Sequence, residues 1–429
     1  MGHELSRYRD ALDFLFARTT GGSKFGLERT EALLRVLGDP HRRLRCLHVA
    51  GTNGKGSVCA TLEAVLRHRG LRVGRYTSPH LVDFRERFLV DGAAVDAEYV
   101  IDFIERWTPT VERIGATFFE ATTAMAFAWF AEAGVDAAVI ETGLGGRLDS
   151  TNVVRPLVAG VTAIGIDHVE YLGDTRESIA AEKAGIFKAG VPAVIGEPDL
   201  GIAALLATFA RDRRAEPVIS VWHDAPPRNV RVSDLGTTFR LVALGEDLTL
   251  RTPLLGEHQA SNTTLALLMV RAAGEGFLTT LADAAPALAG VQLPGRFHRR
   301  GPFIFDVAHN PDGATVVART VGMVGVARPL AALLTVLVDK DWRGVMRALA
   351  PVVDLFVLSC APTAPASRAW RVEEALAYAA EQGWPAVMEP DFDAALARST
   401  ELAATVLVTG SFHTVGDAMA RLQVDPLTG

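Results

Sequence analysis

The 429-residue chain has only three cysteines, which are too few and too widely separated for a disulfide framework or a zinc cage. Two of them, Cys46 and Cys59, stand in apolar stretches and are predicted to be small buried hydrophobic residues. The sequence also lacks any uncharged stretch long enough to cross a membrane, and its N-terminus lacks the apolar core of a secretion signal. We therefore expect a cytoplasmic globular protein with no membrane partner.

An excess of positive charge is lacking as well. Lysine and arginine together number 43 against 50 aspartates and glutamates, which gives a formal net charge of −7. This balance argues against a nucleic-acid partner, because nucleic-acid-binding proteins usually present a basic face. Hydrophobic residues make up 49% of the chain and charged residues 22%, a globular composition with enough length for two or three domains.

Short apolar segments that predict strands alternate with amphipathic segments that predict helices, and this order is typical of parallel sheets covered by helices. The strands expected in the first part of the chain are residues 44–50, 71–77, 137–140, 158–164 and 192–195. The helices expected there are residues 5–18, 27–38, 57–69, 96–107, 120–133, 176–188 and 258–273. Residues 229–253 follow a period of two instead, which predicts an antiparallel meander.

A proline and a glycine interrupt both periods within residues 292–296, which predicts a linker. A second alternating unit follows, with strands expected at residues 303–307, 330–338, 355–359, 385–388 and 405–409. The predicted fold class is therefore α/β, with a larger parallel-sheet domain at residues 1–294 and a smaller Rossmann-like domain at residues 295–429. Two such domains joined by a short hinge favour a cleft that closes on ligands.

The strongest local signal is the segment Gly-Thr-Asn-Gly-Lys-Gly-Ser at residues 51–57, between a predicted strand and a predicted helix. Glycines let several backbone N–H groups point at one anion, the helix N-terminus adds partial positive charge, and Lys55 can reach phosphate oxygens. The spacing departs from the common phosphate loop, because no glycine stands five residues before Gly54 and because Gly56 separates Lys55 from Ser57. A glycine-rich turn with an exposed lysine is the alternative, but the strand–loop–helix context favours a nucleotide site.

Because Gly56 replaces the hydroxyl residue that usually holds Mg²⁺ after the lysine, other ligands are expected at the ends of neighbouring strands. Ser78, Glu141 and the pair Asp167-His168 each follow a predicted strand. Ser78 could instead be a turn or cap residue, and His168 could be a hydrogen-bonded imidazole. Glu141 is the stronger candidate, because a carboxylate that ends a buried strand is costly without a partner. Mg²⁺ prefers oxygen ligands, so chemistry alone leaves His168 open.

Ten short motifs follow one another along nearly the whole chain. They are Gly-Leu-Glu-Arg at 26–29, Gly-Thr-Asn-Gly-Lys-Gly-Ser at 51–57, Thr-Ser-Pro-His-Leu at 77–81, Phe-Phe-Glu at 118–120, Glu-Thr-Gly-Leu-Gly-Gly-Arg-Leu-Asp-Ser-Thr-Asn at 141–152, Asp-His at 167–168, Glu-Lys-Ala-Gly-Ile at 182–186, Pro-Gly-Arg-Phe at 294–297, Asp-Val-Ala-His-Asn-Pro at 306–311 and Gly-Ser-Phe-His at 410–413. In this order they resemble the folylpolyglutamate synthase/dihydrofolate synthase family of the Mur ligase superfamily.

The resemblance implies a P-loop-containing, Mur ligase-like ATPase domain and a C-terminal glutamate ligase domain. It implies that ATP drives the joining of L-glutamate to a folate-type carboxylate through an acyl phosphate, which the glutamate amine then attacks. The expected cofactors are ATP and two Mg²⁺ ions. The expected substrates are dihydropteroate, tetrahydrofolate and L-glutamate. We expect a monomer.

The family's residues can be placed on this sequence one by one. The resemblance puts the ATP contacts at Gly54, Lys55, Gly56, Ser57, Asn262, Arg296 and Asp306, and the Mg²⁺ ligands at Ser78, Glu141 and His168. Lys183 matches a lysine that is carbamylated in this family, whereas spacing alone predicts a solvent-facing helix residue or a phosphate partner.

The folate site is expected at Lys24, Phe25, Gly26, Thr117, Phe118, Phe119 and Leu148. Aromatic rings suit a flat heterocycle, although Phe118 and Phe119 also precede an apolar helix and could be core residues. His309 and Asn310 are expected to organise the loop beside Asp306 and to line the closed cleft, of which residues 410–413 form an edge.

The stretch Gly-Gly-Arg-Leu-Asp at 145–149 resembles bifunctional members, so both synthase activities are expected. Folylpolyglutamate synthase alone is the first alternative. A Mur-type ligase acting on a UDP-sugar is the second, and the start of the phosphate loop at residue 51 argues against it. A GTPase switch lacks its Asn-Lys-x-Asp motif, and a dehydrogenase lacks a Gly-x-Gly-x-x-Gly turn with a following acid.

Overall fold

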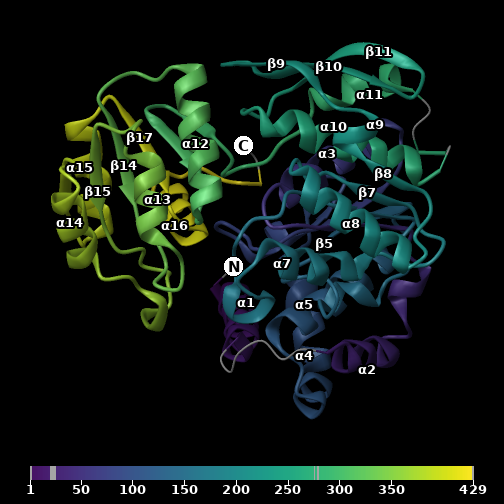
Figure 1. Ribbon diagram of the computed structural model, residues 1–429. Coiled ribbons are helices and arrows are strands. Elements are labelled where there is room, and N and C mark those ends of the chain that lie inside the picture. The colour runs from purple at the N-terminus through teal and green to yellow at the C-terminus, as the bar shows by residue number, and fades with distance from the viewer. Residues whose placement is uncertain (1, 20–25, 275, 278–279, 428–429) are drawn as a thin grey trace.

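The computed structural model describes residues 2–19, 26–274, 276–277 and 280–427. It contains an eight-stranded sheet, a three-stranded sheet and a six-stranded sheet. Figure 1 shows the six-stranded sheet in the green-to-yellow C-terminal part, beside the larger N-terminal part. None of the helices in these residues is long and apolar enough to cross a membrane.

The large sheet has the strand order β4-β3-β2-β5-β1-β6-β7-β8. Its strands are β1 (Cys46–Ala50), β2 (Val73–Tyr76), β3 (Phe88–Val90), β4 (Ala93–Ala94), β5 (Ala137–Glu141), β6 (Val158–Val161), β7 (Ala193–Ile195) and β8 (Val218–Ser220). The six strands from β2 to β8 in this order pair in parallel, whereas β3 and β4 add an antiparallel edge that the sequence did not predict. The carboxyl ends of the parallel strands therefore meet along one edge, where α/β sheets bind ligands.

Helices cover both faces of this sheet, because successive residues of each strand point to opposite sides. Leu47 and Val49 of β1 pack in a cluster with α3 (Lys55–His68) and α10 (His258–Ala272), whereas Cys46 packs in another cluster with α5 (Phe118–Ala133). The helices of this part are α1 (Gly2–Phe16), α2 (Glu28–Val36), α3 (Lys55–His68), α4 (Ala97–Ile114), α5 (Phe118–Ala133), α6 (Val169–Leu172), α7 (Arg176–Lys183), α8 (Leu200–Asp212), α9 (Val221–Asp224), α10 (His258–Ala272) and α11 (Leu281–Leu288). Cys46 and Cys59 are buried and free, as predicted.

The predicted meander is confirmed as an antiparallel sheet of β9 (Arg228–Ser233), β10 (Gly236–Ala243) and β11 (Glu246–Thr252). It lies over α10 and α11, and α12 (Pro311–Val324) of the C-terminal part packs against β9.

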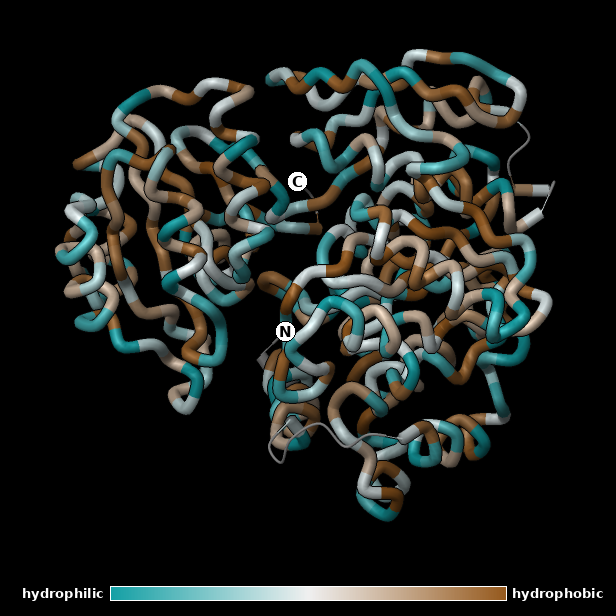
Figure 2. Tube along the Cα trace, in the orientation of Figure 1, coloured by the Kyte–Doolittle hydropathy of each residue, from teal (hydrophilic) through white to brown (hydrophobic). Residues whose placement is uncertain are grey.

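The C-terminal sheet has the order β12-β13-β17-β14-β15-β16, with only β12 antiparallel. Its strands are β12 (His298–Arg300), β13 (Phe303–Asp306), β14 (Leu330–Leu334), β15 (Leu355–Leu358), β16 (Ala386–Met388) and β17 (Thr405–Thr409). Its helices are α12 (Pro311–Val324), α13 (Trp342–Leu349), α14 (Val372–Glu381), α15 (Phe392–Leu402) and α16 (Phe412–Arg421). Figure 2 shows hydrophobic residues concentrated along these strands. The expected boundary at residues 294/295 lies between α11 and β12, and it stays a prediction.

Several predicted element ends differ from the structure. The helix expected at 176–188 ends at Lys183 and continues as a 3₁₀ turn, and α4 continues past Pro109 to Ile114. The strand expected at 330–338 stops at Leu334, because its neighbours β17 and β15 end level with it at Thr409 and Leu358. The 3₁₀ turns are η1 (Ala17–Thr19), η2 (Pro40–Arg43), η3 (Phe84–Arg87), η4 (Ser150–Val153), η5 (Ala184–Ile186) and η6 (Ala366–Arg368).

Candidate active site

The phosphate loop connects β1 to α3 and requires glycine at two positions. Gly54 is the N-cap of α3 with φ +96°, and a Cβ atom there would lie 2.6 Å from Asn262 Oδ1. A Cβ atom at Gly51 would lie 1.7 Å from Thr162 Oγ1. Gly54, Lys55, Gly56 and Ser57 thus surround the N-terminus of α3, and Asn262 of α10 lies directly against the loop. The structure brings these five predicted ATP residues together.

Lys55 folds back over the loop that carries it. Its Nζ donates to the carbonyl oxygens of Gly51 at 3.1 Å and Thr52 at 3.3 Å. The same ammonium lies 3.9 Å from Glu141 Oε1. Because backbone carbonyls carry no net charge, they do not neutralise the Lys55 ammonium. This cation therefore remains available to an anion placed at the end of β1.

Glu141 ends β5, which is the strand between β1 and β2, and its side chain is 6% exposed. Its Oε2 accepts a 3.3 Å hydrogen bond from the backbone N–H of Ser78, the second residue after β2. Burial raises the pKa of the Glu141 carboxyl, and the Lys55 ammonium opposes this rise. This contact places Ser78 beside Glu141 at the carboxyl ends of neighbouring strands. Hydroxyl and carboxylate oxygens are ligands of the kind that Mg²⁺ prefers.

Lys183, the last residue of α7, is buried, and its Nζ donates to the carbonyl oxygen of Gly51 at 2.8 Å. Burial is the main cause that lowers the pKa of Lys183 to about 7, and the nearby Lys55 ammonium lowers it further. The expectation from spacing, a solvent-facing helix lysine, is wrong, because α7 turns this side chain toward the phosphate loop. An amine in such a site can react as a nucleophile near neutral pH.

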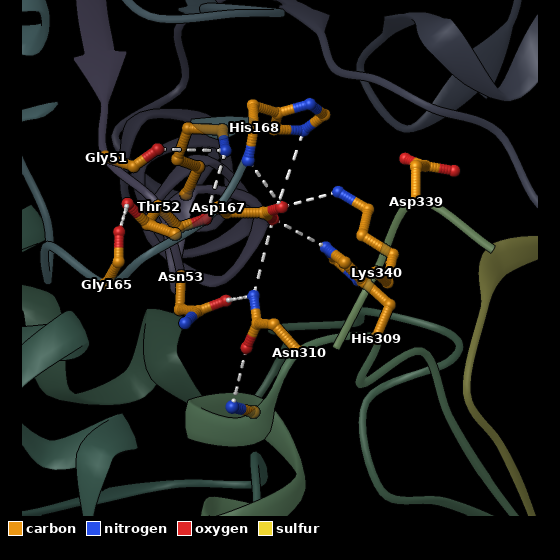
Figure 3. Close-up of polar contacts among 12 residues, drawn as sticks. Gly51, Thr52, Asn53, Gly165, Asp167, His168, His309, Asn310, Asp339 and Lys340 are labelled. Atoms are coloured by element: carbon orange, nitrogen blue, oxygen red, sulfur yellow. Dashed lines mark hydrogen bonds and ion pairs between the residues drawn. The ribbon is translucent and has the colours of Figure 1, made fainter. Parts of the chain in front are cut away.

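Asp167, in the loop after β6, is the centre of a hydrogen-bonded cluster (Figure 3). Its Oδ1 accepts the backbone N–H of His168 at 2.8 Å and forms an ion pair with Lys340 Nζ. Its Oδ2 accepts hydrogen bonds from His309 Nε2 at 3.2 Å and from Asn310 Nδ2 at 3.4 Å. Burial alone would raise the pKa of the Asp167 carboxyl, but His309, His168 and Lys340 together lower it well below its usual range.

The loop after β13 brings His309 to the same cluster. Its Nδ1 lies 2.9 Å from the carbonyl oxygen of Val307, and its Nε2 lies 3.2 Å from Asp167 Oδ2. His309 thus joins Lys340 and Asn310, two other side chains of the C-terminal part, around Asp167.

His168 is placed near this group by an uncommon backbone conformation. Its φ of +53° lies in the left-handed region, and it forms the N-cap of the short helix α6. The His168 side chain is 41% exposed. Desolvation lowers its pKa to about 4, the Asp167 carboxylate opposes this, and the Lys340 and Lys55 charges add to it, so the ring is neutral at pH 7. A neutral imidazole is the form that binds metals.

The positive charge of Lys55 acts on several of the predicted ligands. After the larger effect of burial, its ammonium lowers the pKa values of Glu141, His168 and Lys183. Among the described residues no three His, Cys, Asp or Glu side chains form a metal cage. The predicted ligands include only two residues of these types, Glu141 and His168, so this finding does not test them.

Arg296 and Asp306 lie where the C-terminal part begins. The Asp306 carboxylate accepts the backbone N–H groups of Phe297 and Ala308, both at 2.9 Å, so it fixes the backbone on either side of β12 and β13. Burial raises the pKa of Asp306, and the Arg296 guanidinium lowers it. Arg296 also lowers the pKa of Glu141, so its charge acts on both parts of the chain, and its guanidinium lies 5.6 Å from the Phe412 ring centroid.

The predicted folate residues occupy the start of α5 and the loop after β5. Thr117 caps α5, with its hydroxyl accepting the N–H of Glu120. Phe118 is buried in the hydrophobic core and stacks on Phe16 with ring centroids 5.3 Å apart. Phe119 lies against Gly143, where a Cβ atom would be 2.4 Å from its ring. Leu148 is half-buried in the same loop as Gly143, Gly26 precedes α2 with φ +130°, and Lys24 and Phe25 lie outside the described residues.

Two residues with a role in the site were not predicted. Asp149 holds the loop after Glu141, because its Oδ2 accepts the N–H groups of Gly143 at 2.9 Å and Leu144 at 2.8 Å. Lys340 lies in the loop after β14 and is one of only five lysines in the chain. That rarity, together with a position beyond the carboxyl end of a strand, is the signal that could have identified it.

Comparison with known proteins gives consistent matches over the whole chain. Residues 49–270 match the Mur ligase middle domain, and residues 295–412 match the Mur ligase glutamate ligase domain. A dihydrofolate synthase/folylpolyglutamate synthase of Bacillus subtilis is 33% identical over 437 residues, which cover 97% of this chain and 99% of that protein.

Solved structures agree with this similarity. A Mycobacterium tuberculosis folylpolyglutamate synthase complexed with ADP and AMPPCP superposes with a TM-score of 0.90 at 34% identity and covers 99% of this chain and 100% of that chain. A bifunctional folylpolyglutamate synthase/dihydrofolate synthase with Mn, AMPPNP and L-glutamate bound has a TM-score of 0.79 at 33% identity, with coverage of 96% and 98%.

Proposed function

The chain belongs to the dihydrofolate synthase/folylpolyglutamate synthase family of Mur ligases, and from this premise we propose that it joins L-glutamate to dihydropteroate and to tetrahydrofolate at the expense of ATP. One observation carries the proposal. The phosphate-loop lysine, the buried Glu141 carboxylate and a cluster of C-terminal side chains on Asp167 meet at the carboxyl edge of the large sheet. A ligase that activates one substrate with ATP and then admits a second needs such a junction.

The reaction follows from the charges at this edge. The folate carboxylate oxygen attacks the γ-phosphorus of ATP, the bond from that phosphorus to the β-phosphate oxygen breaks, and ADP and an acyl phosphate result. Lys55 and the amides at the start of α3 stabilise the charge on the transferred phosphoryl group. The glutamate amine then attacks the acyl carbon, gives up a proton, and inorganic phosphate leaves as the amide forms. Until the amine attacks, the side chains of the C-terminal part exclude water from the acyl phosphate.

We propose Asn262, Arg296 and Asp306 as further ATP contacts, beside Gly54, Lys55, Gly56 and Ser57. Relatives bind ADP, AMPPCP and AMPPNP, which supports a nucleotide at this loop. The glycine at position 54 supports the Asn262 assignment, since it allows the two to approach closely. Asp306 also fixes the loop that carries Arg296, because each of its carboxylate oxygens accepts one backbone N–H group.

We propose two Mg²⁺ ions held by Ser78, Glu141, His168 and a carbamylated Lys183. When bound, Mg²⁺ neutralises the phosphate charge and orients the γ-phosphate for attack. In the carbamylation, the neutral Lys183 amine forms an N–C bond with CO₂ and loses a proton, which turns a cation into an anionic oxygen ligand. The burial of Lys183, with a backbone carbonyl as its acceptor, supports this change.

The folate substrates are proposed to bind between the start of α5 and the loop after β5, at Gly26, Thr117, Phe119 and Leu148. Lys24 and Phe25, which lie outside the described residues, are proposed for this site from the resemblance alone. We also assign Phe118 to this site, because it stacks on Phe16, whose side chain is exposed. His309 and Asn310 organise the junction through Asp167. We propose that the enzyme acts as a cytoplasmic monomer without nucleic-acid or membrane partners.

Product analysis with two acceptors tests the double activity. Incubation with ATP, Mg²⁺ and glutamate is expected to add one glutamate residue to dihydropteroate and, in a separate reaction, to tetrahydrofolate, with one phosphate released per amide formed. Mass spectrometry of the products checks this stoichiometry. Product from tetrahydrofolate alone would reduce the activity to folylpolyglutamate synthase, and turnover only with a UDP-linked acceptor would overturn the assignment.

A further inference from the structure

Asp167 is saturated by its neighbours. A carboxylate offers about four lone-pair positions, and here Oδ1 accepts from the His168 N–H and pairs with Lys340, while Oδ2 accepts from His309 and Asn310. Three of these four partners come from the C-terminal part of the chain. The His168 ring lies farther away, with its Nε2 3.9 Å from Oδ2, so the hydrogen bond by which Asp167 holds His168 is the one from its backbone N–H.

The backbone that Asp167 holds is that of His168. The 2.8 Å hydrogen bond from the His168 N–H to the side chain before it closes a tight turn, and His168 itself has a left-handed φ of +53°. A residue with a Cβ atom adopts this conformation only where its surroundings favour it. The orientation of the His168 ring therefore depends on where the Asp167 carboxylate is fixed.

Lys340 is presented to Asp167 by a rigid loop. The backbone N–H of Lys340 donates to Leu337 at 3.0 Å, and that of Val338 donates to Arg368 at 2.9 Å. Arg368 also forms two hydrogen bonds to Asp339, at 2.9 and 2.7 Å. The Lys340 and Asp167 side chains are each only 8% exposed, so this ion pair lies inside the protein (Figure 3).

The turn that carries Asp167 is also joined to the phosphate loop. Thr52 donates through its hydroxyl to the carbonyl oxygen of Gly165 at 3.1 Å and through its backbone N–H to Ala163 at 2.9 Å. Asn310 donates to Asn53 Oδ1 at 3.3 Å as well as to Asp167. A shift of Asp167 would thus disturb both His168 and the phosphate loop.

We propose that Lys340 is a positioning residue of the nucleotide and metal site: its ammonium fixes Asp167, and Asp167 fixes the turn that presents His168. The inference rests on the proposed function, because it uses the assignment of His168 to the metal. It makes the metal site dependent on the C-terminal part, since the positive charge that completes the site comes from there. Truncating a group that orients a metal ligand typically weakens metal binding by about 10- to 100-fold.

Binding of Mn²⁺ in the presence of AMPPNP, measured by electron paramagnetic resonance on the full chain, tests this role without turnover, folate or glutamate. Lys340→Met is expected to raise the dissociation constant of Mn²⁺ by about 10- to 100-fold, and Lys340→Arg to restore most of the affinity. Arg343→Met is the matched control, because it also removes one positive charge and lies only three residues along the chain from Lys340. The Arg343 guanidinium lies over the Trp342 ring. It should bind Mn²⁺ as the unchanged protein does.

Asp167→Asn provides the second variant, should Lys340→Met fail to fold. It is expected to weaken Mn²⁺ binding to a similar extent, and the double variant should bind no worse than the weaker single one, because both changes break the same connection. Unchanged Mn²⁺ affinity in Lys340→Met, together with a loss of turnover, would overturn the proposal and assign Lys340 to direct substrate contact. Additive losses in the double variant would overturn it too. Failure of the proposed function would appear differently, as absence of ligation by the unchanged protein.

Discussion

Glu141→Gln is expected to lower Mg²⁺-dependent turnover by on the order of 10³-fold, because it removes a group that stabilises charge in the transition state. Glutamine keeps the shape and one carbonyl oxygen but removes the negative charge. The buried site would then hold Lys55 without its anionic neighbour 3.9 Å away. Turnover measured over a range of Mg²⁺ concentrations separates weaker metal binding from slower chemistry.

Glu63→Gln is the matched control for this change. Glu63 is another buried glutamate of the same part of the chain, and it pairs with Arg75 at 2.7 Å. Its replacement should lower the melting temperature while leaving the Mg²⁺ dependence unchanged. Near-normal turnover of Glu141→Gln at low Mg²⁺ would show that the metal is held elsewhere.

Lys183→Ala, or thorough removal of CO₂ and bicarbonate from the unchanged enzyme, is expected to lower turnover by at least on the order of 10²-fold, because an anionic ligand of the site is lost. The fold should persist, which circular dichroism can verify. Lys188→Ala, five residues along the chain, is the control; its Nζ donates to the carbonyl of Asn152, and its loss should leave turnover intact.

The pH dependence of this effect has a definite sign. Only the neutral amine reacts with CO₂, and burial lowers the pKa of Lys183 from 10.5 to about 7. The rate at which CO₂ reactivates the stripped enzyme should therefore rise as pH increases through about 7 and level off above it. An amine with its ordinary pKa would give a rate that continues to rise beyond pH 9. Full activity after CO₂ removal would argue against a modified lysine. So would failure of small carboxylates such as acetate to restore activity to Lys183→Ala.

The alternation of apolar and amphipathic segments was sufficient to predict the α/β fold class, because fully buried parallel strands such as β14 are continuous hydrophobic runs. Strand ends and edges were predicted less well. The run from Leu330 to Val338 is hydrophobic except at Thr335, yet the strand ends at Leu334, where the neighbouring strands end. Strands β3, β4 and β12 are only two or three residues long, which is too short for an apolar pattern to predict them, although each pairs with a neighbour that is close in sequence.

The candidate site shows the same division. Residues on a local motif, such as Lys55 at a strand–loop–helix junction, could be identified from their spacing. Lys183 could not be assigned from spacing alone, because helical periodicity does not indicate that Gly51 lies opposite its side chain. Lys340 was missed because its partner Asp167 is 173 residues away and is reached only through packing of the C-terminal part.

Transfer of oxygen-18 from a labelled dihydropteroate carboxylate to inorganic phosphate tests most directly whether the protein is a ligase that acts through an acyl phosphate. Attack of the carboxylate on ATP predicts that each phosphate released with amide formation carries one labelled oxygen, and that release requires the folate substrate. Unlabelled phosphate accompanying amide formation would contradict this route, and phosphate release that is independent of folate and glutamate would contradict the ligase function itself.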